Sequence, residues 1–311
     1  MQPETCNSKP EICSYENSPW RTEFWRGREY EDRAERIALA HMLPPRGTRL
    51  CEIGAGFGRL ADFYRGYERV ILLDYSRSML RNAVERLYGD PRFLFVAADL
   101  YNLPLADSAL DTAVTVRVLH HVADIPRAFV EIARVVRPQG TYLTEFANKR
   151  HVKAILRYAL SFGFAQDRRP PNPFTLEPHE FVKLNFDFHP RYINNELRKQ
   201  NFVVQDQRAV SMFRVAPLKR IIPARILAVL DGALQHPTAR LELSPSIFLR
   251  TESRKPSAPA LNPALWRCPA CGSSDIAESR DALSCRACAR VYPVADGIVD
   301  FKRGQEDKET R

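Results

Sequence analysis

The chain has 311 residues, of which 45% are hydrophobic, so it is long enough for about two domains with an apolar core. No apolar run approaches the ~20 residues of a membrane span, and the N-terminus lacks the apolar segment of a signal peptide, which predicts a cytoplasmic protein. The net charge is +9, but residues 148–267 hold 20 lysines and arginines against nine acids. This excess fits an acidic partner such as nucleic acid, a membrane surface or an anionic metabolite, or a solvated arginine-rich surface.

A leader is expected over residues 1–28. Its first 18 residues are rich in polar residues and proline, which predicts poor order, and Cys6 and Cys13 lack the spacing of a metal site. The stretch Pro19–Trp25 then concentrates aromatic residues, which either pack the leader onto the sheet or form a lid. A helix is predicted from Glu29 to Leu43, where two prolines end it.

A glycine-rich turn follows the first predicted strand, Leu50–Ile53. Gly54, Gly56 and Gly58 allow unusual dihedral angles and a close approach of the backbone to a ligand. Their G-x-G-x-G spacing differs from the G-x-G-x-x-G of dinucleotide-binding folds.

Two acidic residues end the next two predicted strands. The strand Arg69–Asp74 ends 20 residues after Gly54, and the strand Phe93–Asp99 ends in a second acid. In an open parallel sheet, ligands bind at the carboxyl ends of the strands where the strand order reverses. A carboxylate at Asp74 can accept from both hydroxyls of a ribose, and Asp99 is placed to accept from an adenine amino group.

The alternation of strands and helices continues. Leu110–Val116 is a fourth strand, His120 and His121 follow it, Ile125–Val136 has the apolar period of a helix that covers a sheet, and Thr141–Phe146 is a fifth strand. In this order, from about residue 29 to 145, the motifs resemble the class I S-adenosylmethionine-dependent methyltransferases, in the branch of the ubiquinone and menaquinone biosynthesis enzymes. The resemblance implies a doubly wound, Rossmann-like α/β domain with a seven-stranded sheet over residues 29–252.

The same resemblance implies the cofactor contacts. For the methionine half these are Glu52, Gly54, Ala55, Gly56 and Gly58; for the ribose, Asp74 and Tyr75; for the adenine, Asp99 and Leu100; beside the sulfonium, Arg117 or Val118. Methyl transfer needs alignment of the nucleophile and a base only if the nucleophile arrives protonated. His120 and His121 are therefore candidates for a general base, although a histidine at the second position is often structural in this family.

The end of the family fold is also present. A helix is predicted within residues 189–202, Val203–Arg214 is the sixth strand, and Ser246–Thr251 is a reversed strand between the fifth and the sixth. Two insertions, at 148–188 and 216–243, are long enough for lids or helices of their own. The second has an amphipathic helical pattern, which predicts core or lid packing or, alternatively, a helix on a membrane surface.

Four cysteines follow a polar linker at 253–265. Two C-x-x-C pairs, 13 residues apart, have the spacing of a zinc ribbon over residues 266–303: Cys268, Cys271, Cys285 and Cys288. A segment this short needs metal or disulfides to fold, and the missing secretion signal favours structural zinc. From Trp266 to Phe301 the tail resembles the small zinc-ribbon proteins that activate tRNA, rRNA and protein methyltransferases.

Three functions compete. The first is an S-adenosylmethionine-dependent methyltransferase that acts on a small molecule or a lipid or quinone precursor. The second is an RNA or protein methyltransferase that docks through the basic middle region and the ribbon. The third is a nicotinamide oxidoreductase or a non-catalytic nucleotide-binding adaptor, which the glycine spacing and the two acids disfavour. The base-amino methyltransferase motif is absent after strand four, where Val116–Leu119 stands instead, and the sequence indicates no oligomeric state.

Overall fold

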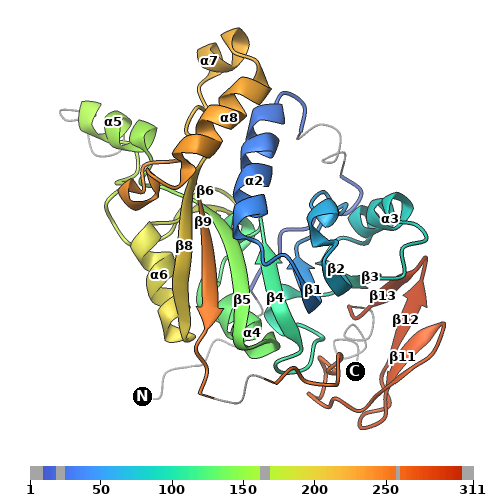
Figure 1. The fold of residues 1–311 in the computed structure, drawn as a ribbon. Coiled ribbons are helices and arrows are strands. Elements are labelled where there is room, and N and C mark those ends of the chain that lie inside the picture. The colour runs from blue at the N-terminus through green and yellow to red at the C-terminus, as the bar shows by residue number, and fades with distance from the viewer. Residues whose placement is uncertain (1–9, 19–24, 162–168, 257–259, 303–311) are drawn as a thin grey trace, which may run out of the picture.

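The computed structural model describes residues 10–18, 25–161, 169–256 and 260–302 (Figure 1). The predicted positions Cys6, Trp20 and Phe24 lie outside these ranges. The helices are α2 (Glu29–Met42), α3 (Arg77–Arg86), α4 (Ile125–Val135), α5 (Val152–Leu160), α6 (Pro190–Lys199), α7 (Ala216–Ile221) and α8 (Ala224–Gln235), with short 3₁₀ turns between them. None of the described helices is both long enough and apolar enough to cross a membrane.

The main-sheet strands are β1 (Gly47–Ile53), β2 (Tyr67–Asp74), β3 (Phe93–Ala97), β4 (Leu110–Thr115), β5 (Val136–Ala147), β8 (Phe202–Val210), β9 (Ser246–Ser253), β10 (Ile276–Glu278), β11 (Ala282–Cys285), β12 (Val291–Ala295) and β13 (Ile298–Asp300). They pair in the order β10-β11-β12-β13-β3-β2-β1-β4-β5-β9-β8. From β3 to β5 the strands are parallel, and β9 runs antiparallel between β5 and β8. The reversed strand expected from the sequence is confirmed.

The sheet separates two apolar cores, because successive residues of each strand point to opposite faces. Leu50 and Leu72 face α2 and α8, whereas Cys51 and Ile71 face α4 and α6. The helices contribute their apolar stripes: Ala34, Leu39 and Ala228 on the first face, and Phe129, Ile132, Ile193 and Leu197 on the second.

The two insertions differ in how they meet this core. The first carries α5, no residue of which is buried, and a separate hairpin of β6 (His179–Val182) and β7 (Asn185–Asp187). The second packs α8 on α2 through a buried polar contact, in which the Tyr30 hydroxyl donates to Asp231 Oδ2 at 2.5 Å. The backbone N–H of Phe213 in turn donates to the Tyr30 oxygen at 2.9 Å, so α2, α8 and the end of β8 are joined. Leu227 and Ala228 of α8 are buried, as core packing of this insertion requires.

The C-terminal segment is continuous with the main sheet. Strand β13 pairs in parallel with β3, with Val299 opposite Val96, and the N–H of Phe301 donates to the Ala97 carbonyl at 2.9 Å. The described sheet therefore has eleven strands rather than the seven expected, because the four C-terminal strands extend it beyond β3.

The stretch before these strands is also attached to the domain. Arg49 donates to the carbonyls of Asn262 at 2.7 Å and Pro263 at 2.9 Å, and Leu105 forms a β-bridge with Trp266. Part of the expected linker thus lies against the end of the sheet that is opposite the carboxyl ends of its parallel strands.

The aromatic contact at this junction generates a first prediction. Phe301 is buried against Tyr292 and Trp266, with ring centroids 4.6 and 5.5 Å away. Phe301→Ala should lower the free energy of unfolding by about 3 kcal/mol or more, because it leaves a cavity between Tyr292 and Trp266. Urea unfolding measures this, with Val291→Ala as the control, since Val291 is 56% exposed and should change stability by about 0.5 kcal/mol or less. Equal effects of the two variants would contradict the tight packing.

Candidate functional site

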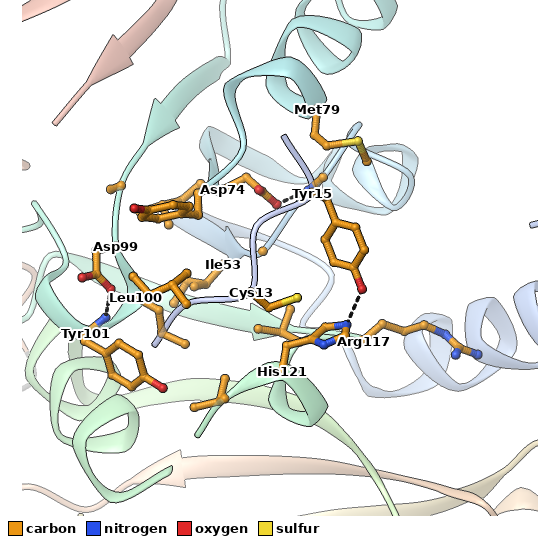
Figure 2. Close-up of a pocket in the computed structure, with 18 residues that line it drawn as sticks. Cys13, Tyr15, Ile53, Asp74, Met79, Asp99, Leu100, Tyr101, Arg117 and His121 are labelled. Atoms are coloured by element: carbon orange, nitrogen blue, oxygen red, sulfur yellow. Dashed lines mark hydrogen bonds between the residues drawn. The ribbon is translucent and has the colours of Figure 1, made fainter. Parts of the chain in front are cut away.

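A cavity lies at the carboxyl ends of β1, β2, β3 and β4, at the point where the strand order reverses (Figure 2). The predicted site residues that line it are Gly54, Gly56, Asp74, Tyr75, Asp99, Leu100, Arg117, Val118 and His121. Four predicted residues are not among its lining: Glu52, Ala55, Gly58 and His120. The structure thus brings together nine residues from four separate strand ends.

The glycine turn begins directly after β1. Gly54, Gly56 and Gly58 all have positive φ values, of 78°, 54° and 70°, which residues with a side chain rarely adopt. A Cβ at Gly54 would collide with the Val118 side chain, so glycine here lets the loop after β4 approach the turn. A Cβ at Gly58 would instead meet the Leu72 side chain at 3.2 Å. Gly58 therefore faces the apolar core, and it is not among the residues that line the cavity.

Asp74 connects the turn to the next loop. Its carboxylate accepts from the N–H of Gly56 and the N–H of Ser76, both at 2.8 Å. Burial raises its pKa, and these two N–H donors act in the opposite direction. Each carboxylate oxygen has a second lone pair, so Asp74 can accept further hydrogen bonds from a ligand. Asp99 similarly accepts from the N–H of Tyr101 at 2.8 Å.

A buried ion-pair network supports the loop that carries Arg117. Glu35 of α2 is 1% exposed and pairs with Arg117 and, at 2.8 Å, with Arg59 of the glycine turn. Burial raises the pKa of Glu35, but the two guanidinium groups more than offset this and lower it overall. Arg117 also donates its N–H to Glu145 at 2.9 Å and has a φ of 60°, so the loop is held in an uncommon conformation.

The described part of the leader crosses the cavity. Ile12, Cys13 and Tyr15 are among its lining residues, and Ile12 forms a β-bridge with Val122. Glu16 accepts from the N–H of Arg77 at 2.7 Å and so caps the start of α3. Poor order is expected here from the polar composition of the leader, and no local pattern indicates these contacts, because the partners are more than 60 residues away.

The two histidines lie beside the cavity in different ways. His121 Nδ1 donates to the Leu184 carbonyl at 3.0 Å, so its Nε2 accepts from the Tyr15 hydroxyl at 2.7 Å. Burial lowers the pKa of His121. Burial and the neighbouring His121, Arg117 and Arg214 lower the pKa of His120 well below its usual value. Both rings are therefore neutral near pH 7, and both nitrogens of His121 have partners.

Glu52 is buried behind the turn beside the buried Tyr64, and neither Glu52 Oε2 nor the Tyr64 hydroxyl forms a hydrogen bond of ordinary geometry among the described residues. Burial raises its pKa to about 8. A buried carboxyl of this kind is costly unless a ligand or a proton neutralises it.

The tail brings its four cysteines together. The sulfur atoms of Cys268, Cys271, Cys285 and Cys288 all lie within 4.8 Å of one another, with 3.6 Å between Cys268 and Cys288 and 3.5 Å between Cys271 and Cys285. Four thiolates at ~2.3 Å from one ion would stand roughly 3.8 Å apart, so the cluster has the dimensions of a tetrahedral metal site.

Glu52 generates a prediction on pH dependence. Between about pH 4.5 and 8 the folded protein keeps this proton and the unfolded chain does not, so stability should fall as the pH rises through this window. Glu52→Gln removes this dependence. As the pH rises through this window, the free energy of unfolding of the variant should therefore increase relative to that of the parent, by up to about 1.4 kcal/mol per pH unit. Urea unfolding at pH 5, 6, 7 and 8 measures the difference; a difference that does not change with pH would contradict the buried, protonated carboxyl.

Comparisons with known proteins agree with this geometry. Residues 51–144 match the family model described as a methyltransferase domain. A demethylmenaquinone methyltransferase of Roseiflexus sp. is 34% identical over 40% of this chain and 53% of its own length. A malonyl-[acyl-carrier protein] O-methyltransferase of Pectobacterium atrosepticum is 34% identical over 33% of this chain and 40% of its own length.

The fold is found in solved structures as well. An S-adenosylmethionine-dependent methyltransferase from Mesorhizobium loti superimposes with a TM-score of 0.50 and 23% identity, over 70% of this chain and 97% of that one. The chain spans about a quarter to a half of the length of the curated relatives it matches. Residues 51–144 are therefore similar to the methyltransferase domain family, and the chain is similar to curated methyltransferases over this region.

Proposed function

We propose that the chain transfers a methyl group from S-adenosylmethionine to a small molecule. The observation that carries this proposal is the cavity between the glycine turn, Asp74 and Asp99, at the switch point of a parallel sheet. Its hydrogen-bonding groups fit an adenosine cofactor. Two carboxylates, which can accept from ribose hydroxyls and an adenine amino group, stand at the ends of neighbouring strands, and a glycine backbone faces them.

The residues divide the cofactor between them. Asp74 and Tyr75 would hold the ribose, Asp99 and Leu100 the adenine, and Arg117 and Val118 the region of the sulfonium. The turn from Gly54 to Gly58 would face the methionine half, and the orphaned oxygen of Glu52 supports a cationic group on that side of the turn. Glu52, Ala55 and Gly58 would act from behind the lining, through the conformation and charge of the turn.

The bound cofactor supplies an electrophilic methyl group whose transfer breaks its bond to sulfur and leaves a neutral thioether. The chain's own residues then have to align the acceptor and exclude water. We assign the leader residues Cys13 and Tyr15 to the exclusion of water, because they lie across the cavity. His121 would position Tyr15 and the Leu184 loop rather than remove a proton, since both its ring nitrogens are engaged. His120, with its strongly lowered pKa, would be a weak base and is assigned to packing.

The acceptor class rests on the relatives. One is named for a demethylmenaquinone and another for a malonyl group carried on a protein, which supports a small organic acceptor. The basic middle region and the ribbon leave docking to RNA or protein as the second candidate, and a cytoplasmic location remains a prediction.

We further propose that the cysteine cluster binds one structural zinc ion. Four cysteines leave no coordination position for water, so the ion would stabilise the tail rather than catalyse. The site supports β12 and β13 and, through β13, the edge of the main sheet. Lys302, just beyond β13, donates to the Tyr75 carbonyl at 2.6 Å, and Asn102 donates to the Pro269 carbonyl at 2.9 Å. Loss of zinc should therefore disturb the loops after β2 and β3, which carry Tyr75 and Asn102 beside the proposed cofactor site.

The cofactor assignment predicts the effect of Asp74→Asn. The asparagine side chain replaces one acceptor oxygen by an NH2 donor. It therefore loses hydrogen bonds to the ribose, and its NH2 group faces a backbone N–H that the carboxylate of Asp74 accepts from, which is unfavourable. Affinity for S-adenosylmethionine should fall by at least ~1.5 kcal/mol, or about tenfold. Isothermal titration calorimetry measures this, with the exposed Asp62→Asn as a control and NAD as a ligand that should not bind. Unchanged affinity in Asp74→Asn would remove Asp74 from the ribose site.

The zinc assignment predicts one zinc per chain in protein purified under reducing conditions, measured by elemental analysis. Cys285→Ser should lower the zinc content and the melting temperature, because a hydroxyl replaces a thiolate ligand. Cys51→Ser is the matched control, since Cys51 is buried in the other part of the sheet and should keep the zinc. A folded tail with far less than one zinc per chain would exclude this site.

A further inference from the structure

A basic groove lies beside the start of α2, outside the cavity described above. It measures about 610 Å³ and is formed by the segment before α2, by α5 and by the stretch from Arg214 into α8. Figure 1 shows α5 and α7 projecting at one end of the molecule, where this groove lies. Among the described residues its cationic lining side chains are Arg26, Arg28, Lys153, Arg214, Lys219 and Arg220, against two carboxylates, Glu29 and Glu31.

Part of this positive charge is not neutralised by carboxylates of the protein. Glu31 pairs with Lys219 at 2.7 Å and with Arg214 at 3.8 Å. In the part of the chain that the structure describes, no ion pair involves Arg26, Lys153 or Arg220, which come from three different segments. Like charges that converge in this way repel one another, and an anion between them would relieve the repulsion.

The walls of the groove are held in place by buried contacts. Tyr30, Asp231 and the backbone at Met212 and Phe213 form the polar network that joins α2, α8 and the end of β8. Lys219 donates to the Gly27 carbonyl at 2.9 Å and so ties α7 to the segment before α2. The cations before α2 and on α7 therefore stand on a preformed scaffold. Lys153 of α5 is joined to it because its Nζ donates to the Arg214 carbonyl.

The groove adjoins the proposed methyl-transfer site. Arg28 lies seven residues before Glu35, the partner of Arg117, so about 10 Å of helix separate the two positions. Burial lowers the pKa of Arg28, and the positive charges of Arg214 and Arg117 lower it further. These three cations are therefore close enough to repel one another. Arg214 also contributes to the lowered pKa of His120, beside the cavity.

We propose that this groove binds a phosphate or diphosphate group of the methyl acceptor, and that the acceptor is therefore a phosphorylated small molecule. This inference rests on the proposed methyl transfer. The convergence of cations in a groove favours a compact, multivalent oxyanion over the extended backbone of a nucleic acid, which would need cations spread along a face. Arginine and lysine are the residues that bind such groups, by bidentate hydrogen bonds and as point charges.

The test uses inorganic pyrophosphate as the probe and the full-length chain. The groove variant Lys153→Glu/Arg220→Glu is compared with Arg157→Glu/Arg225→Glu, which makes the same change in charge on exposed positions of α5 and α8 outside the groove lining. Calorimetry at low salt should show that the parent binds pyrophosphate, that the groove variant binds it at least tenfold more weakly, and that the control variant loses less than threefold. All three proteins should bind S-adenosylmethionine with equal affinity, which also shows that they are folded.

The other outcomes overturn the inference in distinguishable ways. Absence of pyrophosphate binding by the parent, or equal losses in both variants, refutes the groove while the proposed function stands. Pyrophosphate binding without S-adenosylmethionine binding refutes the proposed function, and with it the assignment of the anion to a methyl acceptor. A single-stranded RNA 20-mer that binds more tightly than pyrophosphate, and that the groove variant alone loses, replaces the small molecule by nucleic acid.

Discussion

A single buried carboxylate organises the part of the molecule that surrounds the cavity at the strand ends. Glu35 is 1% exposed, and a charge in that environment is tolerated only if it is paired with good geometry. Its two partners come from different loops, Arg59 from the glycine turn and Arg117 from the end of β4. The guanidinium carbons of Arg59 and Arg117 lie 4.2 and 5.5 Å from the ring centroid of Trp25, so an aromatic side chain covers both arginines. Helix α2, the turn and the loop after β4 are thereby held together. The glycine turn and the loop after β4 both line the cavity.

The sequence predicts the parts of this arrangement that depend on local patterns. Apolar periodicity places the strands around Cys51 and Ile71 and the helix around Ile132, since these residues face a core on one side of the sheet. Ser76, a residue type that is common at helix starts, is the N-cap of α3 and accepts from the N–H of Met79. The glycine spacing and the two strand-end acids predict a site, and the structure brings them to one cavity.

Contacts between distant segments could not be predicted in the same way. Tyr15 meets His121 across 106 residues, and neither position has a local pattern that indicates the other. The Tyr30–Asp231 contact spans 201 residues. Glu35 is one of several acids on α2, and what distinguishes it is its contact with two arginines from distant loops. Cations at positions 28, 153 and 220 are unremarkable one by one, and only the tertiary structure brings their segments to one groove. Such features arise from tertiary packing, on which the order of residues along the chain gives no direct information.

The pairing of β13 with β3 has a consequence for biosynthesis. β3 is an internal strand only when the last of the eleven strands has been made, and Ile298 is 203 residues downstream of Phe95, its partner. At roughly 5–20 residues per second, a ribosome leaves the β3 edge open for about 10 to 40 s. An unpaired strand such as Phe-Leu-Phe-Val-Ala is a template for aggregation during that interval. Until the C-terminal strands emerge and β13 pairs with β3, aggregation of the nascent chain is avoided only if a chaperone covers this edge or if encounters with other chains are slow.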